Sequence, residues 1–131
     1  MKIKDFPNCT YCCIDDNLIH YFAVCERVQT FWISFEKWWI KISGDLGKLD
    51  IKTVILGAPN WSNKADVFNY CLILAKLYVH KSKIKSEIGL IDFYRFLSYL
   101  KDKLVVEELN AVLKDNSYDF EMKFGFVHNN L

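Results

Sequence analysis

The chain has 131 residues with a formal net charge of +1, and 52% of its residues are hydrophobic. This length is typical of a single domain, and the hydrophobic fraction is high enough for a packed core. The near-neutral charge gives no overall attraction for nucleic acid, so any such binding needs a local patch. No apolar stretch approaches the roughly 20 residues of a membrane-spanning helix, which predicts no membrane association.

Near the start of the chain lie four residues of the types that bind zinc, in the pattern C-x2-C-x7-H-x4-C. They are Cys9, Cys12, His20 and Cys25. Two thiolates separated by two residues can bind one ion from a tight turn, and the later His and Cys can complete a tetrahedral site. Four protein ligands leave no open position for water on the ion. The pattern therefore predicts one structural zinc ion and no catalytic one.

Two other interpretations of these cysteines are open. A Cys-x-x-Cys pair can be a redox centre, but that centre expects a strand before it and a helix at its first Cys, which the polar residues 14–17 fit poorly. The cysteines can also be unligated, as we expect for Cys13 and for Cys71, a small core residue. Disulfides are disfavoured because the number of Cys is odd, at five, and because residues 1–10 contain no secretory signal. We expect an intracellular protein, in the cytoplasm or the nucleus, that is not secreted.

The segment after the last ligand has the clearest periodic pattern. Large apolar side chains recur at the spacing of one helix face, at Val28, Phe31, Trp32, Phe35, Trp38, Trp39 and Ile42. Polar residues, among them Arg27, Lys37 and Lys41, are predicted on the opposite face. Gly44 and Gly47 predict that the helix ends near Ser43. Zinc would fix the start of this helix against the turn that carries the first two ligands.

The remaining elements are predicted less sharply. Residues 49–56 form a short apolar element, either helical or extended. A second helix is expected to start with Asn63 as its N-cap, and it should be the most buried helix because it is apolar on nearly every side up to Lys76. A third helical stretch over residues 90–113 is one long helix or two. Residues 118–131 are expected to fray or to pack as an extended strip.

The sequence contains no internal repeat and no Pro-rich or Ser-rich linker, which predicts one domain over residues 1–131. The predicted fold class is mainly α. It consists of a small zinc knuckle over residues 6–26, a bundle of three to four helices over residues 27–115, and a C-terminal tail over residues 116–131.

Three stretches of the sequence carry a resemblance to a known family. They are residues 9–12 with the first two ligands, residues 19–22 around His20, and residues 25–32, in which Cys25 is followed by the Phe31-Trp32 pair. Together they resemble the zinc-binding region downstream of the polymerase in reverse transcriptases of non-LTR retrotransposons, the long interspersed elements. The four ligands match the family's motif one by one, and residues 54–57 and 72–81 are similar to the helical segment that follows. The resemblance covers roughly residues 6–113, and Cys13 departs from it where a polar or small residue is more usual.

The resemblance implies a function. In this family the region is the C-terminal end of a polyprotein that acts as an RNA-directed DNA polymerase, so we expect the chain to be a fragment. It is expected to have no catalytic activity of its own and no small-molecule substrate. Its expected role is to assist the binding of RNA or DNA next to the reverse transcriptase polymerase region of the same polyprotein.

Positive charge is concentrated in the second helix, where a nucleic acid could bind. The candidate residues are Lys76, Lys81, Lys83 and Lys85, with Tyr78 for stacking on unpaired bases. These lysines can equally be solvated surface residues that complement the helix dipole. The alternative function is a structural or protein-interaction domain that docks on the polymerase without touching nucleic acid, through the Trp38-Trp39 pair or the aromatic tail. The competing interpretation of these rings is that they fill the core.

Overall fold

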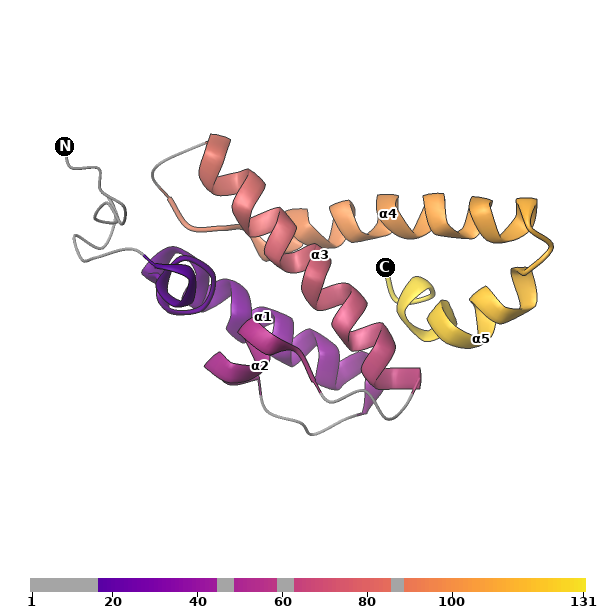
Figure 1. Cartoon of the computed structure of the whole chain (residues 1–131), viewed down its shortest axis with the longest axis horizontal. Helices are drawn as coiled ribbons and strands as arrows, with labels where there is room; N and C mark the ends of the chain where they lie inside the picture. The colour runs from indigo at the N-terminus through magenta and orange to yellow at the C-terminus, as the bar shows by residue number, and fades with distance from the viewer. Residues whose placement is uncertain (1–16, 45–48, 59–62, 86–88) are drawn as a thin grey trace.

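In a computed structural model of the chain, the structure describes residues 17–44, 49–58, 63–85 and 89–131. These residues form a π-helix and five α-helices and contain no strand, so the predicted mainly α class is confirmed. The elements are η1 (His20–Val24), α1 (Glu26–Ser43), α2 (Ile51–Leu56), α3 (Asn63–Lys85), α4 (Phe93–Leu113) and α5 (Ser117–His128). Figure 1 shows α3 crossing α1, and α5 folded back beneath the far half of α4.

The predicted aromatic face of α1 forms the centre of the core. Phe31 meets Phe96 of α4 edge to face with ring centroids 5.5 Å apart, and Trp39 meets Phe126 of α5 at 5.6 Å. Pairs of this geometry add about 0.5–1.5 kcal/mol beyond the burial of their surface. Trp38 is buried as well, at 8% exposure. The Trp38-Trp39 pair therefore fills the core and offers no exposed docking surface.

Short polar contacts set the ends of α1 and α2. Gly44 follows α1 in the left-handed conformation, with φ of 72°, and its N–H donates to the Ile40 carbonyl oxygen at 2.9 Å. Glycine adopts this conformation without a Cβ clash, so the predicted end of the helix is confirmed. Asp50 accepts a hydrogen bond from the Thr53 N–H at 2.8 Å. This N-cap makes residues 51–56 a helix and resolves the choice between helical and extended.

The second predicted helix, α3, contacts α1, α4 and α5. Its Val67, Cys71 and Val79 side chains are fully buried, but Ile73 and Leu77 remain 56% and 46% exposed. The prediction that this helix is the most buried one is therefore wrong, since α1 buries nearly all of its apolar face. The reason is geometric: α3 is apolar on more sides than its neighbours cover.

The C-terminal residues form a helix that packs on the core. One uninterrupted helix, α4, begins after Asp92, whose carboxylate accepts from the Tyr94 N–H at 2.9 Å. The chain then reverses at Asp115, which has φ of 61°. In α5, Phe120 and Val127 are buried, and they lie seven residues apart on one face. The expectation of a frayed or extended tail is wrong, because this face packs against the other helices.

Candidate functional site

The last two predicted zinc ligands are joined by one turn of π-helix. The Cys25 N–H donates to the His20 carbonyl oxygen at 2.8 Å, which is the i to i+5 pattern of this helix type. In an α-helix of 3.6 residues per turn, residues five apart would point about 140° away from each other. The π-turn instead joins the backbone of positions 20 and 25 by a direct hydrogen bond. Such turns occur frequently at functional sites.

Side chains from α1 and α3 hold this turn in place. Three of them donate to carbonyl oxygens at the end of η1: Trp32 Nε1 to Phe22 at 2.6 Å, Gln29 Nε2 to Val24 at 3.0 Å, and Lys83 Nζ to Tyr21 at 2.7 Å. At the other end, the His20 N–H donates to Asn17 Oδ1 at 2.9 Å. Because the last carbonyls of a helix lack partners inside it, these bonds fix the path of the backbone from His20 to Cys25.

The His20 side chain is buried and has no hydrogen-bond partner in the described part of the chain. It is 5% exposed, and neither ring nitrogen bonds to any described group. Leaving a buried polar atom unsatisfied costs about 1–3 kcal/mol. A metal ion on one ring nitrogen would remove that cost for that nitrogen, since neutral imidazole is a common ligand. The Cys25 side chain is also fully buried, so the donor types present at this turn fit zinc.

The other two predicted ligands, Cys9 and Cys12, lie outside the described residues. Within the described ranges, no group of three or more His, Cys, Asp or Glu side chains could hold a metal ion. The structure therefore joins His20 and Cys25 through one backbone hydrogen bond and leaves the complete four-ligand site a prediction.

Arg27 lies in a different place from the one that the helical period predicts. The period places it on the exposed face of the first helix, but it is 5% exposed, and its Nε donates to the Gly89 carbonyl oxygen at 2.7 Å. The Arg27 carbonyl oxygen also accepts from the Ile91 N–H at 2.9 Å. Arg27 thus ties the approach to α4 to the start of α1, and it is not available to a phosphate.

The predicted nucleic-acid residues all lie in the second half of α3 but do not share one face. Lys76 and Lys83 point to the side of α2 and η1. Lys76 Nζ donates to the Ile55 carbonyl oxygen at 3.2 Å, and Lys83 Nζ lies 4.2 Å from the centroid of the Tyr21 ring. Lys85 is exposed at the last position of the helix. Lys76 and Lys83 therefore already donate hydrogen bonds within the protein.

Lys81 lies on the side of α3 that faces α4. Its Nζ and that of Lys103 each lie 5.3 Å from the centroid of the Tyr99 ring, within the range of a cation–π contact. We call these residues the Lys81–Tyr99–Lys103 cluster. Sequence reasoning missed Tyr99 and Lys103 because only the packing of α4 on α3 brings them to Lys81. Tyr78 is half-buried, with its ring stacked on Phe31 at 6.2 Å, and burial raises the pKa of its hydroxyl.

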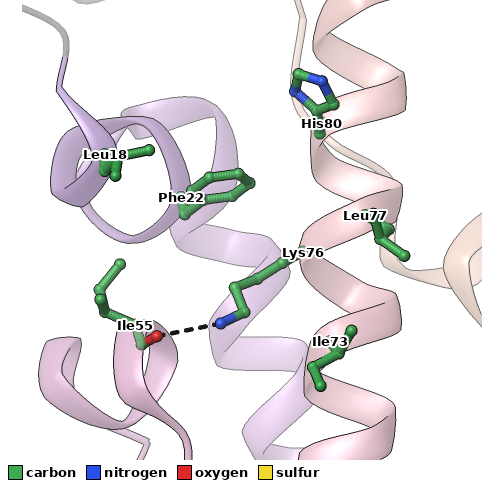
Figure 2. A pocket seen from close by; sticks show the side chains of 7 residues that line it. All are labelled: Leu18, Phe22, Ile55, Ile73, Lys76, Leu77 and His80. Atoms are coloured by element: carbon green, nitrogen blue, oxygen red, sulfur yellow. Dashed lines mark hydrogen bonds between the residues drawn. The ribbon is translucent and has the colours of Figure 1, made fainter.

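An apolar groove lies between η1, α2 and α3 and has a volume of about 430 Å³. Figure 2 shows Lys76 reaching across it from α3 to the carbonyl of Ile55, with aliphatic side chains on both sides. The groove is lined by Leu18, Phe22, Ile55, Ile73, Lys76, Leu77 and His80. This feature was not predicted, because its walls come from three separate stretches of sequence.

In comparisons of this chain with known proteins, no family model, no curated protein and no solved structure matches it. None of the helices in the described part of the chain is long and apolar enough to cross a membrane.

Proposed function

We propose that this chain is a zinc-binding, non-catalytic module similar to the zinc-binding domain of non-LTR retrotransposon reverse transcriptases. Cys9, Cys12, His20 and Cys25 together hold one structural zinc ion. The observation that supports this most directly is the buried His20 ring, whose two nitrogens bond to no described group, one π-turn from a buried Cys25.

The zinc ion supplies a fixed link between the segment that carries Cys9 and Cys12 and the start of α1. The chain's own residues do the rest: Trp32, Gln29 and Lys83 hold the turn, and the aromatic face of α1 anchors it to the core. Binding of a structural metal contributes directly to folding free energy. The ion therefore stabilises the first part of the domain and takes part in no reaction.

The proposed role is to assist the binding of RNA or DNA next to the polymerase region of the same polyprotein. The Lys81–Tyr99–Lys103 cluster supports it, because two ammonium groups can contact phosphates while the half-buried Tyr99 ring offers a surface for a base. The sequence resemblance to the zinc-binding region of these reverse transcriptases also supports this role. With a net charge of +1, binding depends on this local cluster and should be weak at high salt.

The experiment is a titration of fluorescent single-stranded RNA with the zinc-loaded protein at several salt concentrations. Replacing Lys81 and Lys103 by Gln should weaken binding and lower the slope of log affinity against log salt by about 1.4, since each lost phosphate contact on a single strand accounts for about 0.7. The matched control replaces Lys37 and Lys41, which are exposed on α1, and changes net charge equally. Absence of binding at low salt, or an equal loss in both variants, would contradict the role in nucleic-acid binding.

An alternative function is a structural domain that docks on the polymerase region without touching nucleic acid. The observation that favours it is the set of exposed aliphatic side chains beside the groove, of which Leu18 and Ile73 are 70% and 56% exposed. Surface of this kind marks sites of protein association. Binding of the polymerase region by a variant that no longer binds RNA would select this alternative.

A further inference from the structure

The apolar groove has the shape of a docking site for a helix. Ile73, Leu77 and His80 follow one another at i, i+4 and i+7 and so form a continuous stripe along α3. Leu18 and Phe22 lie across from this stripe, as Figure 2 shows. The volume of about 430 Å³ lies within the range of small-molecule pockets, roughly 300–1,000 Å³, so the choice of a helix rests on the open rim and on charge.

The groove is open to solvent along a rim of aliphatic side chains. Leu18, Ile73 and Leu77 are 70%, 56% and 46% exposed. A small molecule in such a site would leave much of its own surface in water. An amphipathic helix laid along α3 would instead cover the rim and the floor together.

The charged side chains that line the groove indicate which charge the partner carries. The described residues that line the groove include Lys76 and His80 but no Asp or Glu. Lys76 uses one N–H for the Ile55 carbonyl oxygen, whereas an ammonium group has three donors. No ion pair of Lys76 occurs among the described residues.

Burial already disfavours the charged form of Lys76 and lowers the pKa of its ammonium group. A wholly apolar partner would remove more water from this charge without replacing the lost interactions, which is costly. A partner with a carboxylate at this point would pair with the ammonium and avoid the cost. The groove is therefore complementary to a helix that is both apolar and acidic.

We propose that this groove binds an amphipathic helix of a protein partner, which inserts apolar side chains along Ile73 and Leu77 and places one Asp or Glu carboxylate against the Lys76 ammonium. This inference goes beyond the proposed function. It requires neither nucleic-acid binding nor the polymerase region, and it follows from the groove alone.

The test is a selection from a phage-displayed library of helical peptides against the full-length, zinc-loaded protein. The enriched peptides should share apolar residues at i, i+3 or i+4, and i+7, together with an Asp or Glu inside that pattern. Synthetic copies of these peptides are then titrated against variants whose helicity matches that of the wild type.

Two variants test separately the apolar contact along Ile73 and the carboxylate contact with Lys76. Ile73→Asp should weaken the peptides at least about tenfold, because it places a carboxylate in the apolar stripe. Its control is Leu109→Asp on α4, where the native side chain is similarly exposed, at 58% against 56%. Lys76→Met keeps the apolar stem and removes the charge, so it should abolish the preference for acidic peptides over their Gln analogues; its control is Lys101→Met on α4.

Several results would overturn the proposal. These are a failure to enrich any peptide over the unselected library, equal affinity of the peptides for wild type and Ile73→Asp, or equal affinity of acidic peptides and Gln analogues for the wild type. Binding of dodecanoate but of no peptide would assign the groove to a small anionic amphiphile. Self-association that Ile73→Asp abolishes would assign it to a second copy of the chain.

Discussion

At the scale of single residues, side chains near the start of α1 have burial and contacts that their residue types alone do not predict. The spacing of His20 and Cys25 predicts them as ligands, and the structure places both in the interior beside one π-turn. The π-turn itself could not be predicted, because it depends on bonds to its carbonyls from residues as distant as Lys83. The helical period misplaces Arg27 for the same reason, since its partner Gly89 comes from a loop that the period ignores.

Cys71 gives a pH-dependent prediction. Burial raises its pKa to about 12 from an ordinary 9.0. Between these values the unfolded chain loses the thiol proton and the folded chain keeps it, so the contribution is fully present below pH 9 and falls as pH rises. We expect Cys71 to account for a loss of about 1 kcal/mol in the free energy of unfolding between pH 9 and pH 10.

Urea denaturation at pH 8, 9 and 10 measures this effect. The variant Cys71→Ala should be less stable at every pH, because it leaves a cavity, but its stability should decline less steeply than that of the wild type above pH 9. Parallel curves for the two proteins would contradict the assignment.

At the scale of elements, the helices with long periodic patterns and clear end residues were predicted most accurately. The long aromatic stripe and Gly44 located α1 closely, whereas the element predicted over residues 49–56 was too short for the period to decide between helix and strand. In α5, Phe120 and Phe124 have the i, i+4 spacing of a helix, but one such pair is too short a pattern for the period to decide. The side of α3 left exposed could not be predicted at all, since it depends on where the other helices pack.

Gly44 and Gly125 have different backbone conformations, so replacing each by alanine should have opposite effects on stability. Gly44 has φ of 72°, and a Cβ added there would meet no atom within 4 Å, so Gly44→Ala meets only backbone strain and should destabilise the protein by about 1 kcal/mol. Gly125 lies within α5, where an added methyl group would meet only the flexible Glu121 side chain, at 3.2 Å. Gly125→Ala should be stabilising by up to about 1 kcal/mol, because alanine favours helix. Thermal unfolding measures both, and equal effects of the two changes would contradict the assigned backbone conformations.

At the scale of the whole molecule, α5 packs against α1, α3 and α4, so we expect it to unfold together with them. Phe120 is 7% exposed, whereas Met122 of the same helix is 68% exposed. We expect Phe120→Ala to destabilise the entire protein by about 3 kcal/mol and Met122→Ala to change stability by less than about 0.5 kcal/mol. The unfolding transitions followed by circular dichroism and by tryptophan fluorescence should shift together.

A fluorescence transition that Phe120→Ala leaves in place would mean that α5 unfolds separately from α1. The fluorescence is informative because three of the four tryptophans, Trp32, Trp38 and Trp39, lie on α1. The same whole-molecule arrangement creates the Lys81–Tyr99–Lys103 cluster and the apolar groove. Neither could be predicted from the sequence, because each joins residues from separate helices through tertiary packing.

The central claim is that the chain holds one structural zinc ion, and the most direct test is the zinc content of the protein purified under reducing conditions. We predict about one zinc per chain. Cys25→Ser should lose the metal and weaken the first helix, while Cys71→Ser, which also alters a buried thiol, should keep it. A zinc content near zero in a protein of normal helicity would contradict the claim.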